Sequence, residues 1–143
     1  MSRCRRVLAH PWLFFIALRA AHRAQRIRQD ALPEVIEHLL RTPGLPRDLE
    51  PALAACLTRL ATRLLAPLGY LGTCMVRASL FATLVGDQDE VVLHIGFFPE
   101  EGRDRIAGHA WVSIGRRVIF DAPQDSVVGG LAMSEAICIP IER

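Results

Sequence analysis

The sequence predicts an α+β fold in which a helical N-terminal half, residues 1–66, precedes a small antiparallel sheet. Apolar residues recur at intervals of three and four through this half, which is the period of an amphipathic helix. After residue 90 the chain contains short runs rich in Val and Ile that flank a Gly-Arg pair, a pattern typical of strands and a hairpin. The length of 143 residues suits one compact domain. We therefore expect a single domain over 1–143, with 67–143 as its second part.

The first predicted helix contains the apolar run from Trp12 to Leu18 and the basic residues that follow it. It follows a basic segment, so the start of the chain superficially resembles a secretory signal. His10, Pro11 and Arg19 interrupt the apolar run, and we expect an amphipathic helix instead. Basic residues recur at i, i+4 and i+7 and therefore share one face, which is either solvated or a dock for an acidic partner peptide or a membrane surface. These residues are Arg19, Arg23 and Arg26.

Two further helices complete the helical half. The first begins near a proline, which is favourable in the first turn of a helix, and ends at a turn rich in Pro and Gly. The second follows the helical spacing of its apolar residues and ends before Pro67. We expect these helices over about 33–41 and 49–64.

Charge and hydropathy exclude several kinds of partner. A net charge of +2 provides no concentrated basic patch for nucleic-acid phosphates. No apolar run approaches the roughly 18 residues that a membrane span requires. His10, His22 and His38 are too scattered for a metal site. We therefore expect no nucleic acid, no transmembrane segment, no metal and no cofactor.

The four cysteines indicate free thiols. They show neither the close pairing of a zinc site nor the density of a secreted disulfide scaffold, so a reducing cytoplasm is the expected compartment. Cys56 lies in an apolar helical row and Cys138 lies between two isoleucines, so we interpret both as small core residues. Only Cys74 has a local context that predicts a reactive thiol.

A fourth predicted helix begins at Cys74. Thr73 is a suitable N-cap, and apolar residues continue at helical spacing to a stop near Gly86. A cysteine in the first turn lies at the positive end of the helix dipole, which favours the thiolate. The unpaired N–H groups there can also stabilise an oxyanion. Cys74 is therefore a candidate nucleophile.

The remaining residues predict strands at about 90–97, 107–114, 118–120 and 137–141. The middle two form a hairpin around Gly115-Arg116. Pro140 cannot donate a backbone hydrogen bond, so it confines the last strand to an edge of the sheet.

His109 and Asp121 lie on the two strands of this hairpin. His109 could take the thiol proton of Cys74, and Asp121 could hold the imidazole in the required tautomer if the two side chains share a face. A two-residue loop places them on opposite faces, whereas a three-residue or bulged connection that uses Gly115 places them on the same face, as we expect. A thiol, an imidazole and a carboxylate together predict acyl-transfer chemistry.

Two neighbours of this set are candidates for substrate binding. Arg77 could contact substrate, or it could pair with an acid such as Asp121 or Asp125. Trp111 alternates with His109 along one strand, so it could line a cleft or belong to the core.

The candidate residues lie in three motifs: Gly72-Thr73-Cys74, Gly108-His109-Ala110-Trp111-Val112 and Phe120-Asp121-Ala122-Pro123. These motifs resemble those of the transglutaminase-like cysteine peptidases, which have a papain-like fold with a catalytic helix packed on a small antiparallel sheet. The short form of this core, with Cys-x-x-Arg and Leu93-His94-Ile95-Gly96-Phe97, is similar to the leader peptidases of lasso-peptide maturation. The resemblance covers roughly residues 70–123.

The resemblance implies that Cys74 is the nucleophile, His109 the general base and Asp121 the orienting residue. It also implies a substrate that is cut between the leader and the core of a precursor peptide. A separate protein would grip the leader, and a separate ATP-dependent lasso cyclase would close the released amine into a ring. Two alternatives remain open: a transglutaminase-like acyl transferase, and a nonenzymatic peptide-binding assembly subunit.

Overall fold

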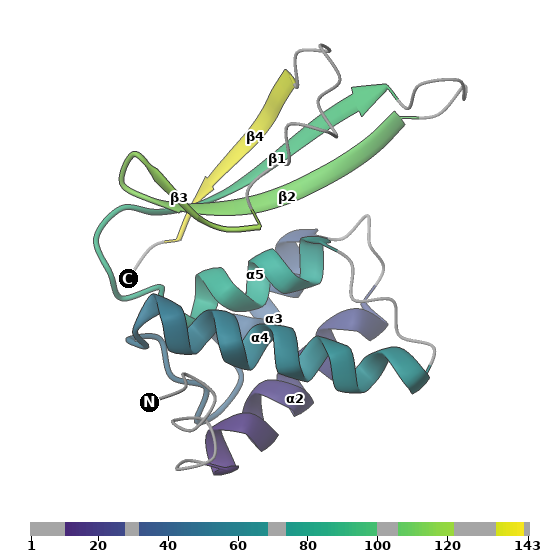
Figure 1. The fold of residues 1–143 in the computed structure, drawn as a ribbon, viewed down its shortest axis with the longest axis vertical. Coiled ribbons are helices and arrows are strands. Elements are labelled where there is room, and N and C mark those ends of the chain that lie inside the picture. The colour runs from purple at the N-terminus through teal and green to yellow at the C-terminus, as the bar shows by residue number, and fades with distance from the viewer. Residues whose placement is uncertain (1–10, 28–31, 69–73, 100–105, 122–133, 142–143) are drawn as a thin grey trace.

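The computed structural model describes residues 11–27, 32–68, 74–99, 106–121 and 134–141, and Figure 1 shows helices on one face of a small sheet. This arrangement confirms the predicted α+β class. The helices are α2 (Pro11–Arg26), α3 (Leu32–Leu40), α4 (Pro51–Leu65), the short 3₁₀ turn η1 (Ala66–Leu68) and α5 (Cys74–Leu84). The strands are β1 (Val91–Pro99), β2 (Ile106–Ile114), β3 (Arg117–Phe120) and β4 (Ser134–Pro140).

The sheet is antiparallel, with strand order β3-β2-β1-β4. The strand that contains Pro140 is therefore an edge strand of the described sheet, as predicted. Along β1 and β2 every second side chain is fully buried or nearly so, on the face of the sheet that packs against α5. They include Leu93, Ile95, Ala110 and Val112. The other face of the same strands carries His94 and Trp111, which are directly opposite one another in the register.

Helix α5 lies between the sheet and the other helices, which explains why it is apolar almost all round (Figure 1). Phe81 on α5 and Phe120 at the end of β3 are both fully buried, and their rings stack with centroids 4.4 Å apart. The guanidinium carbon of Arg59 on α4 lies 5.5 Å from the centroid of the Phe120 ring. These contacts from two helices anchor the end of β3, so they fix the position of Asp121, the next residue.

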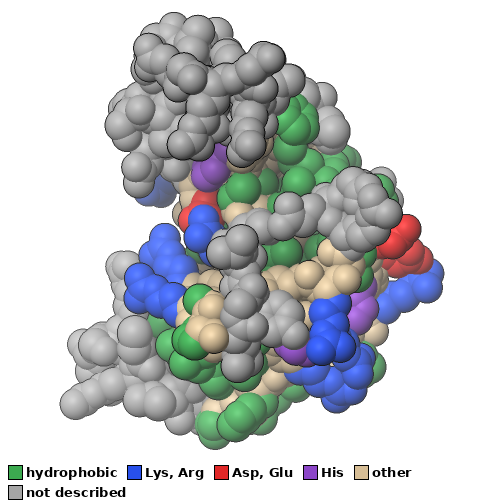
Figure 2. Space-filling model, turned by 90° about the vertical axis from the view of Figure 1, so that its right-hand side faces the viewer, with side chains coloured by type: hydrophobic (Ala, Val, Ile, Leu, Met, Phe, Trp, Pro, Cys, Tyr) green, Lys and Arg blue, Asp and Glu red, His purple; other side chains and the backbone are tan. Residues whose placement is uncertain are grey.

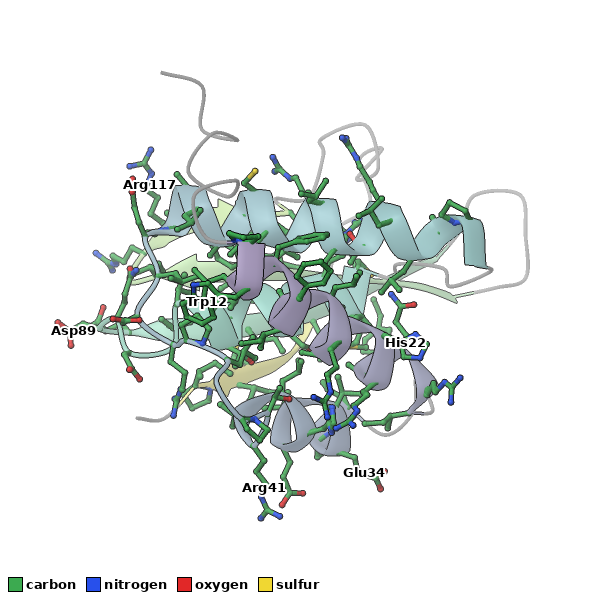
Figure 3. The ribbon with its side chains drawn as sticks, turned by 90° about the horizontal axis from the view of Figure 1, so that it is seen from below. Trp12, His22, Glu34, Arg41, Asp89 and Arg117 are labelled. Atoms are coloured by element: carbon green, nitrogen blue, oxygen red, sulfur yellow. The ribbon has the colours of Figure 1, made fainter. Side chains whose placement is uncertain are left out.

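Helix α2 packs on the core through small residues rather than through its aromatic residues. The buried positions are Leu13 and four alanines, which allow a close approach between helices. Trp12 and Phe15 are instead 54% and 64% exposed. Figure 3 shows Trp12 near the start of α2 and His22 near its end, on the side of the molecule away from the sheet. The predicted basic stripe is exposed on this helix at Arg19, Arg23 and Arg26.

The interpretation of Cys56 and Cys138 as small core residues is correct for only one of them. Cys56 is half-buried against the core, in agreement with a packing role. The interpretation of Cys138 as a core residue is wrong, because its side chain is exposed. Strand alternation explains the error: Ile139, the next residue of β4, packs against the core, so Cys138 projects from the opposite face. Within the described residues, no helix is long and apolar enough to cross a membrane.

Candidate active site

Cys74 is the first residue of α5 and is half-buried. Its thiol donates a weak hydrogen bond to the backbone carbonyl of Gly108 on β2, with an Sγ to O distance of 3.7 Å. The predicted N-cap, Thr73, lies outside the described residues. The start of α5 therefore meets β2 at the residue directly before His109.

The His109 imidazole is held by a backbone group. Its Nε2 lies 2.7 Å from the carbonyl oxygen of Asp121. A carbonyl oxygen can only accept a hydrogen bond, so Nε2 must carry the proton. In the neutral ring, Nδ1 is then the atom with a free lone pair. The structure thus fixes a tautomer in which Nδ1 can accept a proton.

The carboxylate of Asp121 has a different partner from the one expected. Both Nε and Nη2 of Arg77 lie 2.9 Å from its Oδ2. The expectation that this carboxylate itself contacts the imidazole is therefore not met in this structure, where the backbone carbonyl of the same residue makes the contact. Of the two acids considered for Arg77, the structure pairs it with Asp121, and Asp125 lies outside the described residues.

The backbone conformation of Asp121 makes this double role possible. Its φ of +50° lies in the left-handed region, which Asp and Asn tolerate better than other residues with a Cβ. Figure 2 shows a histidine, an acidic and a basic side chain close together on one face of the molecule. Asp121, which directly follows β3, thus contacts His109 on β2 and Arg77 in the first turn of α5, so it links these three elements.

The hairpin places these groups together through a bulge. The turn is a two-residue loop, Gly115-Arg116, and Gly115 has a φ of +57°. The register then shifts between Val112 and Ser113, which leaves Ile119 as the extra residue. The expected bulge is present, but it lies at Ile119 rather than at Gly115. This shift gives residue 121 the parity of the face that carries His109 and Trp111.

The described part of β3 pairs only with the end of β2 from Val112 to Ile114. Gly108, which Cys74 contacts, and His109, which Asp121 contacts, therefore lie in the part of β2 that is not paired with β3. Among the described residues, the hydrogen bond of the Cys74 thiol goes to Gly108 and not to the His109 imidazole. Catalytic hydrogen bonds in ligand-free enzymes are often long and shorten only when substrate binds.

Trp111 supports the imidazole rather than standing in an open cleft. It is only 7% exposed. Its ring centroid lies 6.1 Å from that of His109 and 5.3 Å from that of His94, and both pairs are stacked. The Trp111 ring therefore packs against both histidines. The hydroxyl oxygen of Ser113 lies 2.7 Å from Nε2 of His94.

Two other groups of predicted residues lie apart from these contacts. The basic residues of α2 are on the helix that Figure 1 places farthest from the sheet, so the structure does not bring them to the site. Within the described ranges, no group of three or more His, Cys, Asp or Glu side chains has a metal-binding arrangement.

A thiol at the start of a buried helix, beside a strand that carries an oriented imidazole, is the arrangement of cysteine-based acyl-transfer enzymes. The comparison with protein families agrees with this class. The model of the transglutaminase-like superfamily matches residues 5–128, and the chain belongs to this superfamily, whose members are commonly cysteine-based enzymes. No curated protein and no solved structure matches the chain significantly.

Proposed function

We propose that this protein is a cysteine peptidase that removes the leader from a ribosomally made precursor peptide, with a lasso-peptide precursor as its substrate. Cys74 is the nucleophile, His109 the general base, and Asp121 the residue that orients the base. The observation that carries the proposal is the hydrogen bond from His109 Nε2 to the Asp121 carbonyl. This bond leaves Nδ1 of His109 as the proton acceptor. The Cys74 thiol contacts Gly108, the residue directly before His109.

The first half of the proposed reaction forms a thioester. Nδ1 of His109 takes the thiol proton, and the sulfur attacks the carbonyl carbon at the end of the leader. Backbone N–H groups at the start of α5 stabilise the oxyanion. The tetrahedral intermediate then expels the amine of the core peptide, which leaves with the proton from the imidazolium. The released core thus has the free amine that a separate ATP-dependent lasso cyclase needs for ring closure.

In the second half, Nδ1 takes a proton from water, and the hydroxide attacks the thioester to release the leader as a carboxylic acid. The alternative enzyme, a transglutaminase-like acyl transferase, differs only at this step, where an amine replaces water. A nonenzymatic peptide-binding assembly subunit would need neither the thiol nor the oriented base, so the tautomer fixed at His109 favours an enzyme.

Cleavage of a precursor peptide in ¹⁸O-labelled water distinguishes these alternatives. A peptidase adds one ¹⁸O atom to the new carboxylate of the leader, and the label remains at one atom when a primary amine is added. A transferase instead yields a leader amide whose mass reports the amine. Absence of both products, with binding of the precursor retained, would identify a binding subunit.

We expect the peptidase to be weak alone and to need a separate leader-binding protein. The described half before α5 is helical, so it has no strand edge to which a leader could add as a further strand. The exposed stripe of Arg19, Arg23 and Arg26 on α2 is the proposed dock for an acidic surface of that partner. Titration of the partner should raise turnover of the full precursor and leave a short peptide that spans only the cleavage site unaffected.

Charge reversal tests the dock. Arg19→Glu with Arg23→Glu should remove the stimulation while the basal rate is retained. Arg116→Glu with Arg117→Glu is the matched control, because these residues are also adjacent to one another, exposed and basic but lie on the β2–β3 hairpin. Equal turnover with and without the partner would show that the chain recognises its substrate unaided.

A further inference from the structure

A second thiol and imidazole meet on the face of the sheet away from the helices. Cys138 on β4 is directly opposite His94 on β1, and its Sγ lies 3.5 Å from His94 Nδ1. The side chain of Cys138 is exposed, whereas the imidazole is half-buried. The thiol therefore combines contact with a base and access from solvent.

The His94 ring is fixed on its other sides. Its Nε2 lies 2.7 Å from the hydroxyl of Ser113, which is buried with 5% exposure. Its plane stacks on Trp111 with an interplanar angle of 7°. A serine hydroxyl can accept a hydrogen bond from Nε2–H, and in that tautomer the lone pair of Nδ1 is directed at the thiol. Thiol, imidazole and hydroxyl thus form a second set that parallels the arrangement at His109.

We propose that Cys138 is a second reactive thiol and a modification site for small disulfides of the glutathione class. His94 Nδ1 takes the thiol proton, and the Cys138 thiolate attacks one sulfur of the disulfide. The bond between the two sulfurs of the small disulfide breaks as the bond to Cys138 forms. The leaving thiolate takes the proton back from His94. The products are one mixed disulfide on the protein and one free small thiol, and the small disulfide is the oxidant in this exchange.

The chemistry of the site favours disulfide exchange over acyl transfer. Thiol–disulfide exchange requires a thiolate and an open path to it. Acyl transfer additionally requires donors for an oxyanion, which the start of α5 provides to Cys74. Cys138 lies within β4, whose backbone groups pair with β1, and not at the start of a helix. It can therefore react as a thiolate, but it lacks the oxyanion donors that a helix start provides.

The test treats the full chain with oxidised glutathione and follows each cysteine by mass spectrometry of its peptide. Cys138 should form the mixed disulfide at least about tenfold faster than Cys56, which is half-buried on α4. His94→Asn should slow Cys138 by about tenfold, because an amide cannot take the thiol proton. His22→Asn on α2 is the matched control and should leave the rate at Cys138 unchanged.

Cys56 also reports whether each variant is folded, since loss of the fold would expose it and raise its own rate. If Cys138 in the unaltered protein reacts no faster than Cys56, the proposal is overturned whatever the variants do. An unchanged rate at Cys138 in a folded His94→Asn protein would equally overturn it. Peptide mapping measures Cys138 and Cys74 separately, so the result at Cys138 does not depend on whether the proposed peptidase activity is present.

Discussion

Replacement of Cys74 by Ala, or of His109 by Ala, should abolish leader removal and leave the fold intact. Each substitution removes a group that takes part in covalent catalysis, and such losses reach several orders of magnitude. The double variant should be no slower than either single variant, because the two groups act as one unit. Product formation from the full precursor, followed by mass spectrometry, measures the loss.

Controls for this prediction come from the same chain. Cys56→Ala removes a half-buried thiol without touching the site, so it should retain near-normal turnover. His109 stacks on Trp111, and thermal unfolding of His109→Ala should therefore be compared with that of the unaltered protein. Retained cleavage by the Cys74 variant would exclude this residue as the nucleophile and overturn the mechanism.

The spacing of apolar residues predicted where the helices and strands lie more reliably than it predicted which of their side chains are buried. Helical spacing located α3, α4 and α5 within a few residues, and runs rich in Val and Ile located the strands. On α2, however, the aromatic residues are the most conspicuous apolar positions and yet Trp12 and Phe15 are exposed. The core there consists of alanines, whose small size permits close helix packing but produces a weak sequence signal.

For Cys138, the pattern of its neighbours in the sequence was misinterpreted. Isoleucines on both sides suggested a buried cysteine. In a strand, adjacent side chains point to opposite faces, so two flanking apolar residues place the residue between them on the other face. The same alternation would have predicted that Cys138 is outside the core. Its meeting with His94 depends on strand order and register, which the sequence does not specify.

The sequence predicted which residues form the candidate site, but it predicted their contacts only in part. Cys74, His109 and Asp121 were identified from their local motifs, and the contacts of Cys74 with Gly108 and of His109 with Asp121 bring their segments together. A pattern of residue types predicts side-chain chemistry. It has no signature for a backbone carbonyl as the partner of an imidazole, and for this reason the contact made by Asp121 differs from the expected one.

The contact made by Asp121 leads to a prediction that separates its backbone from its side chain. Asp121→Asn should reduce turnover by less than about tenfold. Asparagine tolerates the left-handed φ of +50°, retains an oxygen that can accept from Arg77, and leaves the carbonyl bonded to His109. If the carboxylate oriented the imidazole, the same substitution would cost about 10⁴-fold, as in a serine-protease triad.

Asp121→Val should have the opposite effect and reduce turnover by at least about a hundredfold. A β-branched residue is strained at this φ, so the backbone should relax and carry the carbonyl away from His109 Nε2. Asp121→Gly provides the matched comparison, because glycine accepts the same φ but lacks the carboxylate that Arg77 binds. Steady-state rates for the three variants should therefore rank Asn above Gly and Gly above Val. A loss near 10⁴-fold that is equal in Asn and Gly would assign the orienting role to the carboxylate, because those two variants share only its removal.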